Sequence, residues 1–301
     1  RPRPGRLRPH GQGRGMTTAL QAAALIILAI VSFYTFWRIR WGYPGRGLPR
    51  VLTYHKVTDF EFGGTWISRR RFERHISSLL GSGYSFIDES TFLATVEGDR
   101  QSGEKEILLT FDDGYDCFAR SAAPVLERLG VPALVFLVSG FAGMENSWEL
   151  GLPGRKARHM DWETVKGVWA RGFSFGSHCE NHLPLTRLTR EEALGEMVRS
   201  KAEIEARTGA EVRSLSYPFG RTDPEVSRLA AEAGYRAAFA LYPHGDAGEM
   251  DRFRLRREGV WVIDTPATVR IKLSRGRLFW LEDIKGRMIN AVADLTPLLR
   301  R

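Results

Sequence analysis

Residues 106–138 have the sequence EILLTFDDGYDCFARSAAPVLERLGVPALVFLV. The stretch begins with an apolar run at 106–111, continues with a helical pattern from about Cys117 to Leu129, and ends with a second apolar run at 132–138. Two buried parallel strands need a crossover connection between them, and a helix usually supplies it. The stretch therefore predicts a parallel strand–helix–strand unit.

The same alternation extends on both sides of this unit, from about residue 51 to residue 260. Further strand candidates lie at 51–57, 84–88, 173–177, 212–217 and 236–241, and helical patterns lie at 69–83, 161–170, 189–208 and 223–233. Seven strand candidates that alternate with helices favour a distorted (β/α) barrel over an open sheet. In such α/β folds, catalytic groups collect on the loops at the carboxyl ends of the strands.

Composition divides the chain into five segments. We expect a basic tail at 1–15, a transmembrane helix at 19–37, a linker at 41–50, a catalytic domain at 51–264 and a helical extension at 265–301. Within the extension, the stretch at 280–299 is expected to pack across the barrel bottom. The net charge of +9 resides at the N-terminal end, because residues 1–50 contain nine Arg and no acidic residue. No nucleic-acid partner is expected, because that function needs a basic stripe on the folded domain.

The segment at 19–37, ALQAAALIILAIVSFYTFW, contains no charged residue. As a helix it would be about 28 Å long, close to the ~30 Å hydrocarbon core of a bilayer. It ends in aromatic residues rather than in the small residues of a cleavage site, which favours an uncleaved anchor. Arginines flank the segment on both sides, so the orientation of the helix in the membrane stays open. Met16 is a candidate initiator, and in that case residues 1–15 are not translated.

Two adjacent carboxylates, Asp112 and Asp113, follow the apolar run at 106–111. They repel each other unless a cation lies beside them. Because neighbouring strand side chains point apart, both can serve one site only where the backbone turns, as Gly114 allows. A plain Asp-Gly turn is the alternative interpretation.

A pair of histidines, His178 and His182, follows the strand candidate at 173–177. In a helical turn they would lie on one face, close enough to bind one metal ion, and unrelated surface histidines are the alternative. With one strand-end carboxylate they would provide two nitrogens and one oxygen. Such a set leaves positions open for water, as in catalytic rather than structural metal sites.

Other candidate residues also lie at strand ends. Pro218 and Gly220 flank Phe219 and predict a tight turn whose backbone N–H groups could donate to an oxyanion. His55 lies in the first strand candidate, where a buried core histidine is the default interpretation. Cys117 and Cys179 are expected to be core thiols, with a disulfide near the site as the alternative.

Several motifs together resemble the NodB-type polysaccharide deacetylases, carbohydrate esterase family 4. They are TFDDG at 110–114, the H-x-x-x-H pair, YPFG at 217–220, PRVLTYHKV at 49–57 and RLRREGV at 254–260. The resemblance covers about residues 49–262 and implies one divalent metal, Zn, Co or another ion, bound by Asp113, His178 and His182. It implies Asp112 as the base and, from the branch with an N-terminal Tyr-His segment, His55 as the general acid.

The sequence departs from the family pattern at two motifs. Many members have an Arg at the position of Ser216 that orients the base, and a downstream Leu-x-His that supplies the acid. Neither is present here. We expect Arg257 to replace the missing cation, and His244 is the next candidate for the acid. Cys179 stands where the family usually has Ser or Thr.

The resemblance implies metal-dependent hydrolysis of N-acetyl groups from an N-acetylated polysaccharide or surface glycan. Tyr217 and Trp162 are expected to contact the sugar, Trp66 and Trp148 are further candidates, and the backbone N–H of Phe219 is expected to bind the oxyanion. Competing functions are O-deacetylation, hydrolysis of another amide, and glycan binding without catalysis.

We expect this domain to be anchored to a membrane and extracytoplasmic, because glycans of this class lie outside the cell. The cytoplasmic face is the alternative. The oligomeric state is not indicated by the sequence.

Overall fold

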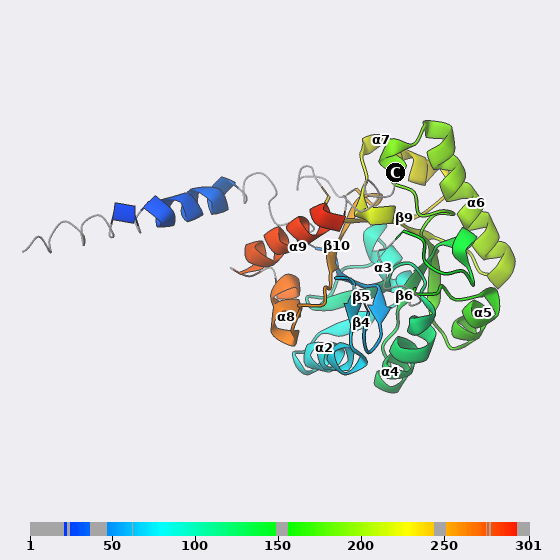
Figure 1. Cartoon of the computed structure of the whole chain (residues 1–301), viewed down its shortest axis with the longest axis horizontal. Coiled ribbons are helices and arrows are strands. Elements are labelled where there is room, and N and C mark those ends of the chain that lie inside the picture. Colours follow the sequence, from blue (N-terminus) through cyan, green and yellow to red (C-terminus); the bar gives the residue numbers. More distant parts are fainter. Residues whose placement is uncertain are drawn as a thin grey trace, which may run out of the picture. The chain divides into compact units, whose positions relative to one another are not determined.

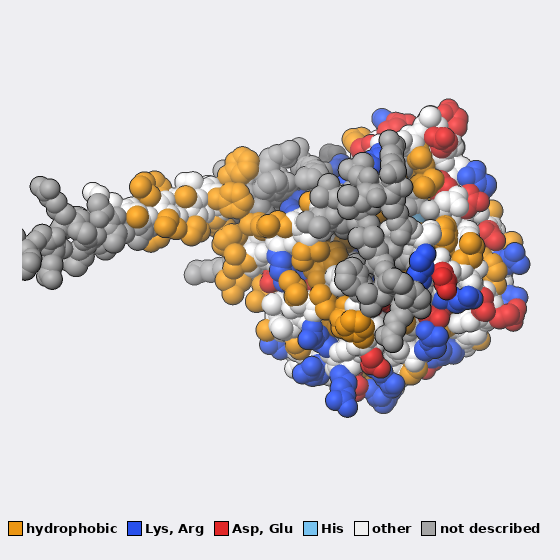
Figure 2. Space-filling view, viewed as in Figure 1, with side chains coloured by type: hydrophobic (Ala, Val, Ile, Leu, Met, Phe, Trp, Pro, Cys, Tyr) orange, Lys and Arg blue, Asp and Glu red, His pale blue; other side chains and the backbone are white. Residues whose placement is uncertain are grey.

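The computed structural model describes residues 21–22, 25–36, 47–61, 63–148, 156–243, 251–274, 276 and 278–293. The chain divides into two compact units, Arg1–Tyr43 and Pro44–Arg301. In the first unit residues 25–36 are helical, and their large apolar side chains are 46–67% exposed (Figure 2). Within the described residues no helix is both long and apolar enough to cross a bilayer, and the predicted anchor at 19–37 lies partly outside them.

Seven parallel strands form a closed barrel in the second unit (Figure 1), which confirms the predicted barrel. They are β1 (Arg50–Tyr54), β5 (Glu106–Phe111), β6 (Leu134–Leu137), β7 (Ser174–Ser177), β8 (Ser214–Ser216), β9 (Ala237–Leu241) and β10 (Leu255–Gly259). The first strand closes the ring, because β1 pairs with β10 on one edge and with β5 on the other. All seven strands therefore end at the same face of the barrel.

The barrel is distorted beside β5. β4 (Ser85–Ile87) pairs with the amino half of β5, whereas β6 pairs with β5 only at Thr110 and Phe111. The predicted strand at 84–88 thus exists but lies beside the ring, and the seventh member is β10, which the sequence pattern did not predict. Three consecutive charged residues occupy the middle of β10, so it does not resemble a buried strand. A separate pair consists of β2 (Lys56–Val57) and β3 (Trp66–Ile67).

Helices surround the barrel (Figure 1). They are α2 (Arg69–Gly81), α4 (Ala123–Leu129), α5 (Trp162–Ala170), α6 (Arg190–Thr208) and α7 (Pro224–Glu232), whereas the helix α3 (Glu89–Val96) packs its buried side chains into the cluster that fills the barrel. Side-chain N-caps fix where five of these six helices begin, namely Ser68, Asp88, Asp161, Thr189 and Asp223. Each cap satisfies a backbone N–H that has no partner within the helix.

The barrel strands are apolar along their whole length because both of their faces are buried. On β5, Leu108 belongs to the cluster that fills the barrel, whereas Ile107 and Leu109 belong to the core between barrel and helices. Cys117 and Cys179 are buried free thiols, which confirms the prediction of core cysteines.

The C-terminal extension contains α8 (Pro266–Ser274) and α9 (Phe279–Ala293). The prediction that residues 280–299 cross the barrel bottom is wrong for their described part, because α9 reaches the carboxyl ends of β8 and β9. There Asn290 Nδ2 donates to the Phe219 carbonyl at 3.4 Å, and Arg287 Nη1 donates to the Tyr242 carbonyl at 3.0 Å. Asp283 of α9 is fully buried and pairs with Arg256 of β10, so ion pairing outside the barrel sets the position of this helix.

Candidate active site

The predicted site residues converge at the carboxyl face of the barrel. Asp112 and Asp113 follow β5, His178 and His182 follow β7, and Phe219 follows β8. Asp113 and His178 are 65 positions apart in the sequence. A closed barrel nevertheless brings the carboxyl ends of β5 and β7 to the same face. The fold thus assembles the set that the sequence suggested.

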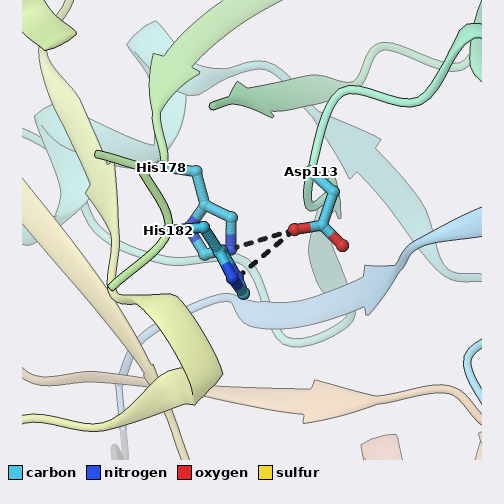
Figure 3. Close-up of side chains that lie close together, drawn as sticks. All are labelled: Asp113, His178 and His182. Atoms are coloured by element: carbon cyan, nitrogen blue, oxygen red, sulfur yellow. Dashed lines mark ion pairs between the residues drawn. The ribbon is translucent and has the colours of Figure 1, made fainter. Parts of the chain in front are cut away.

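The donor atoms of Asp113, His178 and His182 match the spacing of a metal site (Figure 3). Nε2 of His178 lies 3.5 Å from Oδ1 of Asp113, and Nε2 of His182 lies 3.4 Å from the same oxygen. All three donor atoms lie within 4.8 Å of one another. Two ligands about 2.0–2.1 Å from one zinc ion at a tetrahedral angle are about 3.3–3.4 Å apart, so this set fits such an ion.

Both histidines are suited to act as neutral ligands. Burial lowers the pKa of His178 to about 4, and burial together with the nearby His178 lowers the pKa of His182 well below its usual range. His178 Nδ1 donates to the Ser216 carbonyl at 2.6 Å. Because that nitrogen carries the hydrogen, the lone pair of Nε2 faces Asp113, which is the arrangement found in histidines that bind metals.

Strained backbone is concentrated in these loops. Among the described residues other than glycine, five have positive φ: Asp113 (68°), Cys179 (66°), His182 (55°), Phe219 (60°) and Tyr242 (49°). The histidine pair is therefore brought together by a non-helical turn, not by the helical turn considered from the sequence. Each such conformation costs about 1–3 kcal/mol and persists only where the surroundings hold it, which is common at active sites.

Asp112 is held by Arg257 across the barrel. Nη1 and Nη2 of Arg257 donate to Oδ1 and Oδ2 of Asp112 at 2.6 and 2.8 Å, and both side chains are buried. Arg257 Nη2 also donates to Ser216 Oγ at 2.8 Å. Arg257 therefore places its guanidinium beside Ser216, where the family resemblance led us to expect an arginine.

The Asp112 carboxyl group is ionised in this environment. Burial by itself would raise the pKa of Asp112, but the positive charge of Arg257, with smaller effects from His178 and His55, holds it well below its usual range. A carboxylate with both oxygens bound by one arginine is also fixed in orientation. The pair thus presents an oriented, charged carboxylate at the barrel face.

His55 lies at the rim of the same site. It follows β1, and the Tyr54 carbonyl just before it accepts a hydrogen bond from the Asp112 backbone N–H at 2.9 Å. Its charge contributes to the pKa values of Asp112, His178 and His182. The side chain is half-buried, with its ring centroid 6.4 Å from that of Trp261. His244 lies outside the described residues.

The YPFG segment forms a single turn, Pro218–Gly220, beside the histidines. Gly220 has φ 66°, and a Cβ there would lie 2.3 Å from the Leu241 Cβ, so only glycine fits. This close approach places the Phe219 ring 4.6 Å from that of His182. The Phe219 side chain is thereby held against His182, one of the three candidate ligands.

The aromatic residues predicted to bind sugar have different surroundings. Tyr217 is fully buried and its hydroxyl donates to the Phe253 carbonyl at 2.8 Å, so the prediction that its ring stacks on substrate is wrong. Trp162 is half-buried, with the Arg207 guanidinium 5.5 Å from its ring centroid, and its contact with sugar stays a prediction. Trp148 stacks on the ring of His182 at 4.3 Å. Trp66 contacts Phe60.

One residue in contact with the site was not predicted at all. His159 is buried, and its Nδ1 lies 2.6 Å from the Asp113 carbonyl oxygen. It lies in a segment without helical or strand periodicity, just before the N-cap Asp161. A lone histidine in such a segment carries no signal in a single sequence.

Comparisons with known proteins point to one family. Residues 99–238 match the family model described as polysaccharide deacetylase. The chain is 27% identical over 207 residues to YxkH of Bacillus subtilis (strain 168), whose name assigns it to the polysaccharide deacetylases, with 69% of each chain covered. It is 21% identical over 213 residues to a poly-β-1,6-N-acetyl-D-glucosamine N-deacetylase of Staphylococcus aureus (strain MSSA476), covering 64% of this chain and 71% of that protein.

Solved structures share the fold. IcaB from Ammonifex degensii superimposes with a TM-score of 0.65 and 24% identity, covering 77% of this chain and 97% of that one. The Streptococcus pyogenes deacetylase PplD, in complex with acetate, gives a TM-score of 0.64 and 20% identity, with 76% and 98% covered. At such identities the likeness establishes the architecture.

Arg257→Met should reverse the direction of the Asp112 pKa shift, because burial would no longer be offset. In the native protein Asp112 stabilises the fold above its unfolded pKa of about 3.9, and this contribution is lost only as the pH falls through the lower folded value. In the variant the folded pKa lies above the unfolded one, so stability is lost as the pH rises. Urea unfolding should show a loss of ~3–5 kcal/mol at pH 8 and a smaller loss at pH 5.

Arg257→Lys is the matched control. Lysine keeps the charge but cannot bind both carboxylate oxygens in a fixed plane, so its stability should lie between those of the native protein and the Met variant. A Met variant whose stability depends on pH as the native protein does would show that Arg257 does not control the ionisation of Asp112.

Proposed function

We propose that the chain, whose residues 99–238 match the polysaccharide deacetylase family, hydrolyses the N-acetyl groups of an N-acetylated polysaccharide and releases acetate. The observation that carries this proposal is the pairing of two kinds of carboxylate at one barrel face. Oδ1 of Asp113 lies close to the Nε2 atoms of two neutral histidines, while both carboxylate oxygens of Asp112 accept hydrogen bonds from Arg257. One carboxylate is placed to bind metal, and the other is left to accept a proton.

Asp113, His178 and His182 would hold a divalent metal, which we propose to be Zn and which Co could replace. Their donor separations fit tetrahedral coordination, and the two nitrogens with one oxygen leave room for water and substrate. When bound, the metal would polarise the acetyl carbonyl and lower the pKa of a water molecule.

Asp112 would accept a proton from the attacking water at a carboxylate oxygen. Its low pKa keeps it ionised, and Arg257 fixes its orientation, so no rearrangement is needed before the proton is transferred. The positive charge of Arg257 also makes the carboxylate a weaker base, which suits a proton acceptor that works beside a metal ion.

His55 would donate a proton to the leaving amine. An amide nitrogen departs poorly unless it is protonated, so this reaction needs a general acid on the side of the sugar. The backbone N–H of Phe219 would donate to the developing oxyanion, because its strained turn is held next to His182.

An amide rather than an ester is the proposed substrate. The site has a candidate acid at His55, and the relatives from Staphylococcus aureus are named as N-deacetylases of poly-β-1,6-N-acetyl-D-glucosamine. Acetate release should be measured with matched N-acetyl and O-acetyl oligosaccharides. Release from the N-acetyl substrates alone supports the proposal, and release from the O-acetyl substrates alone refutes it.

The two aspartates should behave differently when each is changed to asparagine. Asp113→Asn should lose bound metal and activity together, because a set of three ligands has no spare. Asp112→Asn should keep the metal and lose ~10²- to 10⁴-fold in rate, because only the proton acceptor is removed. Elemental analysis and acetate release check both results. Loss of metal from Asp112→Asn with retention in Asp113→Asn would reverse the two roles.

His55→Ala should distinguish an acid from a structural residue. Release of acetate from an N-acetylated oligosaccharide should fall ~10²- to 10⁴-fold, the range of general acid catalysis. Hydrolysis of nitrophenyl acetate should fall much less, because its leaving group departs without a proton. A parallel loss of both activities together with a lower melting temperature would make His55 a structural histidine.

We also propose that residues 19–37 anchor the protein in a membrane, with the catalytic domain on the extracytoplasmic side. The exposed apolar side chains of the helix at 25–36 support the anchor, and the glycan substrate supports the orientation. The full chain should stay in the membrane pellet after an alkaline carbonate wash, whereas a chain that begins at residue 48 should not. Protease added to intact cells should digest the domain, and digestion only after lysis would place it on the cytoplasmic face.

A further inference from the structure

The position of the Asp113 carboxylate depends on a strained turn. Asp113 has φ 68° and Gly114 has φ 60°, so two successive residues adopt left-handed backbone conformations. The first is unfavourable for aspartate, and the turn must be held by contacts from elsewhere in the fold. Gly114 also lies against β6, where an added Cβ would lie 2.6 Å from Leu137 Cδ2.

The segment at 158–160 supplies such contacts. Its backbone runs antiparallel to the segment at 114–116, with Met160 N donating to the Gly114 carbonyl and Asp116 N to the Arg158 carbonyl, both at 2.9 Å. Between these two backbone bonds, the His159 side chain turns toward Asp113. Its Nδ1 lies 2.6 Å from the Asp113 carbonyl oxygen.

The His159 ring is itself fixed by aromatic neighbours. It stacks on the Tyr115 ring with centroids 4.7 Å apart. The Trp148 ring is tilted relative to the His159 ring, with the two centroids 5.0 Å apart. The Tyr115 hydroxyl accepts a hydrogen bond from Asn146. Trp148 also stacks on His182 at 4.3 Å, so the cluster around His159 contacts two of the three candidate metal ligands.

We propose that His159 is a positioning residue that aims the Asp113 carboxylate by holding its backbone carbonyl. A carbonyl oxygen only accepts, so Nδ1 of His159 carries the hydrogen. His178 makes the same kind of bond to the Ser216 carbonyl, where it orients a ligand ring. His159 orients the backbone of a ligand instead. The inference rests on the proposed metal-binding role of Asp113.

The test compares two substitutions that separate the donor from the ring. His159→Phe keeps a stacking ring but removes the donor, and His159→Asn keeps a donor near the position of Nδ1 but removes the ring. The Kd for Zn²⁺, measured by competition with a chromophoric chelator, should rise about 10- to 100-fold in the Phe variant, as for other outer-shell partners of metal sites. The Asn variant should recover most of that loss.

Two further measurements exclude a merely structural role. The Co²⁺-substituted Phe variant should show a changed visible absorption spectrum, because the ligand field changes when Asp113 shifts. A Phe variant that has a lower apo melting temperature but the native Zn²⁺ affinity and Co²⁺ spectrum would overturn the proposal.

Two controls keep the result interpretable. If the Phe variant does not fold, the Zn²⁺ affinities of His159→Asn and His159→Gln test the proposal instead. The Asn amide can reach the Asp113 carbonyl, whereas the longer Gln side chain carries its amide past that carbonyl, so the Gln variant should bind Zn²⁺ more weakly. Equal Zn²⁺ affinity in these two would overturn the proposal. Asp113→Asn is measured in parallel, and native affinity in that variant would instead refute the metal site itself.

Discussion

The interaction on which the site depends is the buried ion pair between Asp112 and Arg257. Asp112 directly follows β5 and Arg257 lies in β10, and β1 pairs with both of these strands where it closes the ring, so the pair forms only when the barrel closes. Either charge alone would be very costly to bury, and together they are compensated by two hydrogen bonds between them and by Ser216. Closure of the fold and ionisation of the proposed base therefore depend on each other.

Around this pair, the loops at the carboxyl face carry strain that the rigid barrel supports. Asp113, His182 and Phe219 all have positive φ, and each is held by a contact that the rest of the fold provides. Phe219 is fixed by the close approach of Gly220 to Leu241, and Asp113 is contacted by His159. Such preorganisation places the donor atoms before metal or substrate binds, at a cost that the core of the barrel offsets.

The strand β10 connects the site with the C-terminal extension. Successive side chains of a strand point to opposite faces, so Arg257 points into the barrel while Arg256 and Glu258 point outward. Arg256 pairs with Asp283 of α9, and the same helix reaches the Phe219 carbonyl through Asn290. One strand of charged residues thus anchors the proposed base on one side and a covering helix on the other.

The alternation of apolar runs with amphipathic stretches and N-cap residues was enough to predict the barrel, because these patterns are local in the chain. The ligand types could also be predicted, because Asp112 and Asp113 directly follow β5 and the histidine pair begins directly after β7. The choice of Asp113 over Asp112 as the ligand came from the family resemblance. What only the tertiary structure decided was the burial of β10, the burial of Tyr217, the path of α9 and the contact of His159 with Asp113. Each depends on a partner distant in sequence, and a charged or polar residue becomes a core residue only when that partner compensates it.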